Sequence, residues 1–384
     1  MTDNVFTNEE VEKLKEQIYK TGFVLENKIC RLLEDNNWSI INNRYYLDDL
    51  EGKDREIDII AYKVHITEEV LYYTTLVISC KKSEKNSWTF LTKDINQNDP
   101  NIHFCPVNNW SNHKILKFML EDGDQNIEYR ILELSKHAPP LDFIYGMDKQ
   151  VFAFQQLNKT NFSPQNDRDI YNSIITTIKA LEYEKNSLDK RIKHKALYNF
   201  NLLSIFDGDM IQLHFDSEGE RPQKIDEIKY LNRHIVNKEE SFYRVHFMKY
   251  EKLNSYIENL NELHRFHTEF YPSLMEEFYS NVPYYSSNKG WKLLIDEFEE
   301  EILWRLNYYY DPSENLLDRL ILDYDEDEEL LYIDIEGKDM TYSEEIDALS
   351  KLNDMSRVLE ITSSALEEVY RYEGNFIFAR PSPF

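Results

Sequence analysis

Two apolar runs near the N-terminus decide the fold: EIDIIAYKV, residues 56–64, and YTTLVISCK, residues 73–81. Both are rich in β-branched and aromatic residues, which is typical of strands. Charged residues stand at one end of each run, Glu56 and Asp58 in the first and Lys81 in the second. Residues two apart on a strand share a face, so pairing of the two strands gathers these side chains at one end of a sheet.

A helix is predicted over residues 7–35, ahead of these strands. Thr7 and Glu10 form a capping-box pattern, and apolar residues then recur at helical spacing. Gly22 interrupts or joins two helices within this range. Glu26 lies four residues after Gly22, from where it can lean over the end of the sheet.

The rest of the chain is predicted to form strands and helices joined by short connections, since the whole sequence holds only 9 Gly and 11 Pro. Strands are expected at 38–41, 200–206, 210–215, 242–248 and 330–335, and helices at 148–158, 168–186, 250–271, 290–310, 313–323 and 343–372. The turn Asp207-Gly208-Asp209 is typical of a hairpin between two of these strands. Trp88 is expected to pack in the core. The predicted domains are 1–250 and a mostly helical, acidic 251–384.

Composition indicates a globular protein. Of the 384 residues, 41% are hydrophobic, which excludes a disordered chain. The three cysteines show no paired spacing, so neither a disulfide framework nor a zinc knuckle is indicated. No apolar run approaches the roughly 20 residues that span a bilayer. We therefore expect a protein of the cytoplasm that has no membrane partner.

The net charge of −27 argues against contact with nucleic acid, because phosphate binding favours a basic surface. The charge is unevenly placed, since residues 271–384 hold 27 acidic and 9 basic residues, a net of −18 that leaves −9 for the first 270. Basic clusters occur at 81–85 and 190–195. Lys82 and Lys85 are the expected nucleic-acid contacts, whereas the acidic region would repel DNA.

The residues at the sheet end suit hydrolysis of a phosphodiester. That reaction uses a divalent cation to polarise the phosphoryl oxygen and activate water. Mg²⁺ takes hard oxygen ligands and needs only one or two carboxylates, here Asp58 and Glu26, while Lys81 stabilises the developing charge. His264 and His267, three apart on an expected helix, also permit a metal, but no Cys or third His is nearby.

Two stretches, TGFVLENKICRLLEDNNWSIINNRYYLDDLEGKDREIDIIAY (21–62) and LVISCKKSEKNSW (76–88), resemble the PD-(D/E)XK, or restriction endonuclease-like, nuclease superfamily. The similarity is to a bacterial branch reading Gly-x-x-x-Glu, then Arg-Glu-x-Asp-Ile, then Glu-Cys-Lys-Lys-Ser. It implies an α/β (α+β) fold with an α/β/α core and a mixed central sheet. It also implies Glu26 as the helix acid, Asp58 as the principal metal ligand, Lys81 as the catalytic lysine and the Cys80 carbonyl as a main-chain ligand.

Ser79 departs from this pattern, because it stands where the branch has Glu or Gln. Glu56 could replace the missing carboxylate from the neighbouring strand. Two functions stay open: an endonuclease that uses Mg²⁺ or Mn²⁺ on DNA, in bacterial defence, or a catalytically degenerate binding or regulatory module. The acidic C-terminal region would then bind a protein partner or form a homo-oligomer.

Overall fold

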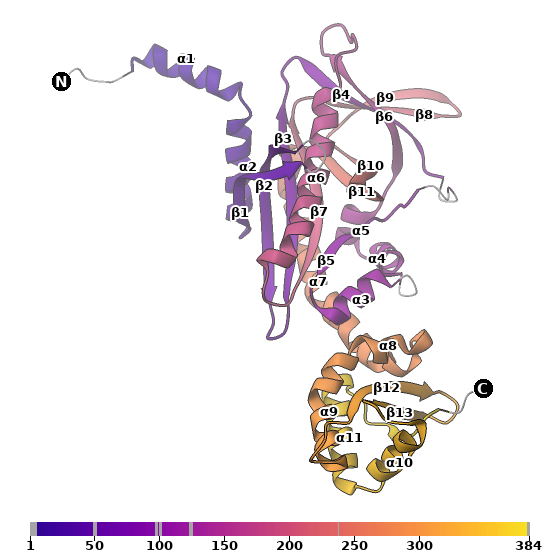
Figure 1. Cartoon of the computed structure of the whole chain (residues 1–384). Helices are drawn as coiled ribbons and strands as arrows, with labels where there is room; N and C mark the ends of the chain where they lie inside the picture. Colours follow the sequence, from indigo (N-terminus) through magenta and orange to yellow (C-terminus); the bar gives the residue numbers. More distant parts are fainter. Residues whose placement is uncertain are drawn as a thin grey trace, which may run out of the picture. The chain divides into compact units, whose positions relative to one another are not determined.

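The computed structural model describes residues 6–48, 52–96, 99, 102–122, 126–236 and 238–381 (Figure 1). They form two compact units, the first drawn from Met1–His113 and Leu120–Glu269, the second from Lys114–Met119 and Phe270–Phe384. Both units share helix α7 (Leu253–Asn281), in which the division falls. The boundary predicted near residue 250 lies at the start of that helix.

A seven-stranded sheet organises the first unit, with strand order β1-β2-β3-β7-β11-β10 and β5 paired to β7. β1, β2 and β3 form an antiparallel meander, and β7 runs parallel to both β3 and β11, so the sheet is mixed. Its strands are β1 (Ser39–Asp48), β2 (Lys53–Ile66), β3 (Leu71–Lys82), β5 (Asn108–Ser111), β7 (Ala196–Asp207), β10 (Glu227–Val236) and β11 (Glu239–Lys249). The strands predicted at 38–41, 56–64 and 73–81 are confirmed.

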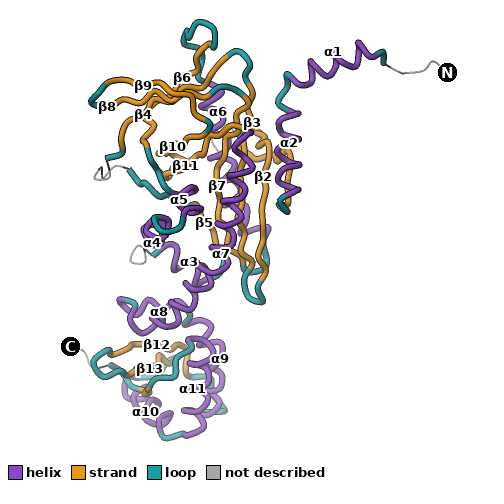
Figure 2. Tube along the Cα trace, turned by 180° about the vertical axis from the view of Figure 1, so that it is seen from behind, coloured by secondary structure: helices purple, strands orange, loops and turns teal. Residues whose placement is uncertain are grey.

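Helices cover both faces of this sheet (Figure 2). Thr74 of β3 hydrogen-bonds to Nδ1 of His264 on α7, at 2.9 Å. Val77 of the same strand belongs instead to a core cluster with Ile174 of α6 (Arg168–Arg191). Because residues 74 and 77 are an odd number apart, they point to opposite faces. The fold is therefore α+β, with helix, sheet and helix in three layers.

The predicted N-terminal helix is two helices, α1 (Asn8–Tyr19) and α2 (Phe23–Asp35). The capping box of Thr7 and Glu10 is present at the start of α1. Gly22 is the N-cap of α2, so it separates the two helices. Three further helices follow one another between β5 and the strand at residues 149–158: α3 (Lys114–Glu121), α4 (Ile127–Ser135) and α5 (Pro139–Tyr145).

A second sheet of the first unit has the order β6-β4-β8-β9. Its strands are β4 (Asn86–Asp94), β6 (Lys149–Asn158), β8 (Met210–Asp216) and β9 (Gly219–Ile225). The hairpin predicted between residues 200–206 and 210–215 is wrong, because β7 belongs to the first sheet and β8 to the second. Among the connections between the two sheets, those from β3 to β4 and from β7 to β8 are short and lie side by side, because β3 and β7 are parallel neighbours.

Aromatic stacking fixes this double crossing. The Trp88 and Phe206 rings are stacked with centroids 3.9 Å apart, and both side chains are fully buried. A Cβ at Gly208 would lie 2.5 Å from the Phe206 ring and 3.0 Å from the Ser83 carbonyl, so the corner requires glycine. The sequence Asp207-Gly208-Asp209 would suit a hairpin. Here it instead carries the chain from one sheet to the other, because Phe206 stacks on Trp88, which is distant in the sequence.

Two predicted helices are strands, and bulges explain both errors. In β6, where a helix was predicted over 148–158, the register with β4 shifts and leaves Phe152 as an extra residue, 48% exposed. In β12 (Leu317–Asp325), where a helix was predicted over 313–323, the shift falls between Leu317 and Arg319. An extra residue converts the two-residue spacing of buried side chains into three, which imitates a helix.

Residues 251–384 are mostly helical, as predicted, but they also form a three-stranded sheet, β12-β13-β14, of which only the strand at 330–335 was expected. Trp291 packs on Tyr370, whose hydroxyl donates to the Trp291 carbonyl at 2.7 Å. The further elements of the second unit are η2 (Val282–Tyr284), η3 (Ser286–Asn288), α8 (Lys289–Leu293), α9 (Ile295–Tyr310), β13 (Leu330–Gly337), α10 (Tyr342–Asn353), α11 (Ser356–Tyr370) and β14 (Asn375–Phe378). The short helix η1 (Tyr250–Lys252), just before α7, belongs to the first unit. Among the described residues no helix is long and apolar enough to cross a bilayer.

We predict that Trp88→Ala destabilises the first unit by about 3–5 kcal/mol, the usual cost of removing a large buried aromatic side chain. Urea unfolding followed by circular dichroism measures this change. Tyr45→Ala is the control, because that side chain is 63% exposed and should change stability by less than about 0.5 kcal/mol. Equal effects of the two substitutions would contradict the role of the stack.

We also predict that acid weakens the packing of α7 on β3. Burial lowers the pKa of His264 to about 4 and that of His267 to about 3, so both imidazoles are neutral in the fold. Since unfolded histidine titrates near about 6.5, their contribution is complete above that pH and is lost as pH falls toward the folded values. The urea midpoint of His264→Gln/His267→Gln should fall less than that of the wild type between about pH 7 and about pH 5. Parallel losses in the two proteins would contradict this assignment.

Candidate active site

The structure brings Asp58 and Lys81 together at the end of the β2–β3 pair. Lys81 Nζ lies 3.6 Å from Asp58 Oδ2, and the two side chains are 30% and 21% exposed. The last registered pair of these strands is Ile59 with Ile78, so the strands part where the charged residues begin. The Cys80 backbone N–H donates to Asp58 Oδ2 at 2.5 Å instead of to a strand carbonyl. This bond fixes the Asp58 carboxylate at the point where β2 and β3 separate.

Glu26 of α2 completes the cluster. Burial raises the pKa of the Glu26 carboxyl, and the nearby Asp58 charge raises it further, while Lys81 lowers it. Two carboxylates that repel each other beside one ammonium form a site that gains from an added cation. Gly22 lies next to this side chain, but a Cβ at Gly22 would be 3.5 Å from Glu26 Oε1, an ordinary van der Waals contact, so Glu26 does not require a glycine at position 22.

Cys80 contributes its backbone. Its carbonyl accepts from Lys81 Nζ at 3.1 Å, so the lysine is held between that oxygen and Asp58. Burial raises the pKa of the Cys80 thiol, and the Asp58 and Glu26 charges raise it further. The thiol therefore stays protonated, which leaves the carbonyl as the donor atom that Cys80 offers.

Ser79 does not reach the site. Its side chain is fully buried, and its Oγ has no hydrogen-bond partner among the described residues. Its neighbour in the parallel register is Ser204 of β7, which is equally buried. The residue that replaces the expected Glu therefore faces the interior and cannot meet a ligand from solvent.

The remaining predicted residues lie at the same end of the sheet. Glu56 is exposed, and its charge contributes to the raised pKa of Glu26. Lys82 Nζ is 3.1 Å from Asp207 Oδ2 and donates to the Tyr19 carbonyl at 2.8 Å. Lys85 is exposed. Of the two lysines expected to contact nucleic acid, Lys82 is thus already engaged within the protein.

The donor set fits a hard divalent cation. Within the part of the chain that the structure describes, no three His, Cys, Asp or Glu side chains are grouped closely enough to hold a metal by themselves. Mg²⁺ does not need such a group, since it commonly binds through one or two carboxylates and keeps several waters. Asp58, Glu26 and the Cys80 carbonyl are the atoms that would hold it. His264 and His267 fit less well, because both Nδ1 atoms face the Thr74 hydroxyl at 2.9 Å.

A second polar site was not predicted from sequence. A cavity of about 330 Å³ lies beside β10 and β11, and its lining includes Glu227, Lys229 and His246. Burial lowers the pKa of Lys229 to about 8 and that of His246 to about 4. Glu227 Oε2 is 3.6 Å from His246 Nε2. The sequence carries no signal for this site, because β10 and β11 hold several other charged residues and nothing in the local pattern distinguishes these three.

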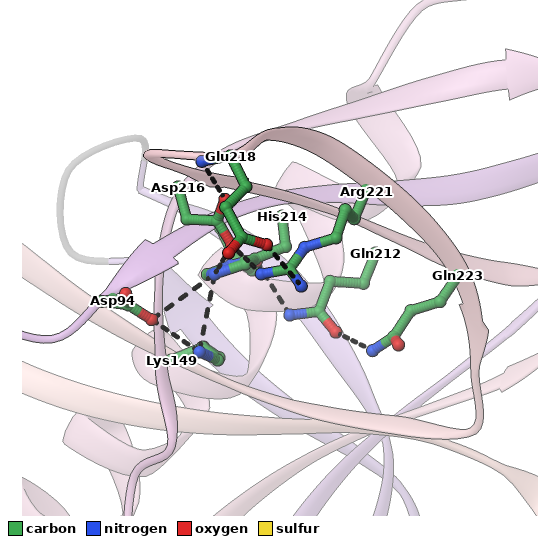
Figure 3. A network of polar contacts seen from close by, with 9 residues as sticks. Asp94, Lys149, Gln212, His214, Asp216, Glu218, Arg221 and Gln223 are labelled. Carbon is green, nitrogen blue, oxygen red and sulfur yellow. Dashed lines mark hydrogen bonds and ion pairs between the residues drawn. The ribbon is translucent and has the colours of Figure 1, made fainter.

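One wall of this cavity continues into a network on the second sheet (Figure 3). Lys149 Nζ is 2.6 Å from Asp94 Oδ1, and His214 Nδ1 is 3.1 Å from the Thr92 hydroxyl. Arg221 pairs with Asp216. Because both cations already have carboxylate partners, this network joins strands β4, β6, β8 and β9 and offers no free charge to a substrate.

No family model matches this chain, and neither a curated protein nor a solved structure shows a significant match.

We predict that Glu26→Gln stabilises the protein at neutral pH when divalent cations are absent. The folded pKa of Glu26 is raised, so ionisation of this carboxyl opposes folding at any pH above that folded value. Below the unfolded pKa both states are protonated and the variant should match the wild type. Urea midpoints at about pH 7 and about pH 4 measure the two limits. A Glu26→Gln protein that is less stable at neutral pH would contradict the predicted repulsion.

Proposed function

We propose that the first unit is a metal-dependent phosphodiesterase that acts on DNA. The observation that carries this proposal is the convergence of Asp58, Lys81 and Glu26 at the point where β2 and β3 part. A mixed sheet with helices on both faces is also what the resemblance to the restriction endonuclease-like superfamily implies. DNA, as opposed to RNA, and a setting in bacterial defence come from that resemblance alone.

The roles of the residues follow from their contacts. Asp58 Oδ2 accepts from the Cys80 N–H and lies beside Lys81 Nζ, so Oδ1 is the oxygen that would bind a cation. Lys81 keeps its ammonium beside Asp58, where it can neutralise charge that develops on a phosphate. Glu26 binds a proton more readily than an ordinary glutamate, which suits the transfer of a proton from water. A bound Mg²⁺ or Mn²⁺ would supply phosphoryl polarisation and a more acidic water.

A second candidate is a nuclease fold that binds without turnover. Two observations favour it: Ser79 supplies no carboxylate, and the lysines around the site are mostly paired. Lys249 Nζ is 2.9 Å from Asp226 Oδ1, and Lys159 Nζ is 3.2 Å from Asp209 Oδ2. Since Ser79 is fully buried, Ser79→Glu would bury a carboxylate, and a failure of that variant to cleave would be ambiguous.

Cleavage of plasmid and linear duplex DNA with Mg²⁺ or Mn²⁺ tests the leading proposal. We expect wild-type protein to cleave, and Lys81→Ala and Asp58→Asn each to lose at least about 100-fold in rate, because each removes charge stabilisation. Lys93→Ala, an exposed lysine on β4, should cleave like the wild type. Thermal melting shows that each variant is folded.

Metal titration separates the two candidates. If the site binds metal, adding Mn²⁺ should raise the melting temperature of the wild-type protein, because the metal binds only the folded state. Asp58→Asn should abolish that rise. Wild-type protein that binds DNA but neither cleaves it nor responds to Mn²⁺ would support the second candidate. Cleavage that survives Lys81→Ala would remove that lysine from the mechanism.

A further inference from the structure

Helix α1 has no buried residue. Figures 1 and 2 both show it projecting from the sheet of its own unit. Its 12 residues are locally well specified, with the capping box at Thr7 and ion pairs such as Lys13 to Glu9 and Lys20 to Glu16. A lone helix of this length is nevertheless marginal in water, and most helical stability comes from packing an apolar face. The apolar face of α1 is available to a partner.

The spacing of that face is that of a two-stranded coiled coil. Val11, Leu14 and Ile18 occupy successive a, d and a positions of a heptad. Leu14 is 50% exposed and Ile18 is 48% exposed, which is unusual for aliphatic side chains on one helical stripe. A β-branched residue at a with leucine at d favours parallel dimers over higher oligomers. The identity of the three residues therefore points to a second helix of the same kind.

The charged residues beside the apolar face indicate whether the two α1 helices would pair in parallel or antiparallel. In this heptad register Glu10 is the g residue just before Val11, and Lys15 is the e residue that follows Leu14. Both are exposed, although within their own helix Glu10 accepts from Thr7 and Lys15 pairs with Glu12. In a parallel dimer each g residue faces the e residue five positions further along the other helix, so Glu10 meets Lys15 twice. In an antiparallel dimer centred on Leu14, the two Lys15 side chains would face each other. The arrangement of charges thus favours the parallel, in-register pair.

We propose that α1 is a dimerisation helix, which binds α1 of a second copy of this chain in parallel through Val11, Leu14 and Ile18. The end of α1 is anchored to its own unit, because Lys82 Nζ donates to the Tyr19 carbonyl. Each helix is therefore presented from a fixed base. This proposal is independent of the nuclease function, since it depends on none of Glu26, Asp58 and Lys81.

Analytical ultracentrifugation of the full chain tests the association. We expect a concentration-dependent dimer in the micromolar to submillimolar range, and a monomer for Leu14→Glu at the same concentrations. Because Leu14 contacts no core, its replacement should leave the urea midpoint unchanged. Glu16→Gln, at the outer f position of α1, is the matched control and should remain dimeric, because Glu16 pairs with Lys20 and not with Glu10 or Lys15. A monomeric wild type, or a Leu14→Glu protein that still dimerises, would overturn the proposal.

Cysteine cross-linking tests the orientation. The native Cys30, Cys80 and Cys105 are buried, so an added cysteine on α1 is the exposed thiol. In a parallel pair Val11→Cys should form a disulfide-linked dimer by itself in a glutathione buffer, whereas Glu16→Cys, at the outer f position, should not. An antiparallel pair would cross-link only when Val11→Cys is mixed with Ile18→Cys, and that result would contradict the parallel register.

Discussion

The parallel pairing of β3 with β7 is the constraint on which the first unit depends. It registers Leu71–Lys82 against Ala196–Asp207 and places the carboxyl ends of both strands at one edge. Both strands then leave for the second sheet side by side, where the Trp88 and Phe206 rings stack. The same edge carries Asp58 and Lys81, so the packing that joins the two sheets also fixes the base of the candidate site. Sheet topology and site geometry are thus one feature of the fold.

Both carboxylates and lysines lie at that edge of the sheet. The chain has a net charge of −27, and cations near the site, such as Lys82, Lys159 and Lys249, are paired with carboxylates. Only Lys81 lies directly between the site's acid and a backbone carbonyl. Repulsion between Glu26 and Asp58 costs stability in the absence of a cation, which is a common property of sites shaped for binding. A surface of this kind favours a local cation over broad attraction to phosphate.

The second unit and helix α1 differ in how much they bury: the second unit has its own core, whereas α1 has no buried residue. In the second unit aromatic packing of Trp291 with Tyr370 closes a core around a small sheet. Helix α1 buries nothing, although its caps and ion pairs define it well. A helix with a capping box and ion pairs but no buried side chain would gain stability if its apolar face packed against a partner.

The sequence by itself determined the order of the N-terminal helices and the first three strands, and the meeting of Asp58 with Lys81, because both follow from short-range periodicity and alternation. It failed at β6 and β12, where a bulge changes the spacing of buried residues, and at the turn around Gly208, where stacking on Trp88 replaces a hairpin with a corner. It also did not foresee that Ser79 is buried or that Glu227 lies beside His246. Those features depend on how strands pair and pack, and only the tertiary structure decides that: Ser79 is buried against Ser204, which lies 125 positions further along the chain, and Glu227 meets His246 only once β10 and β11 have paired.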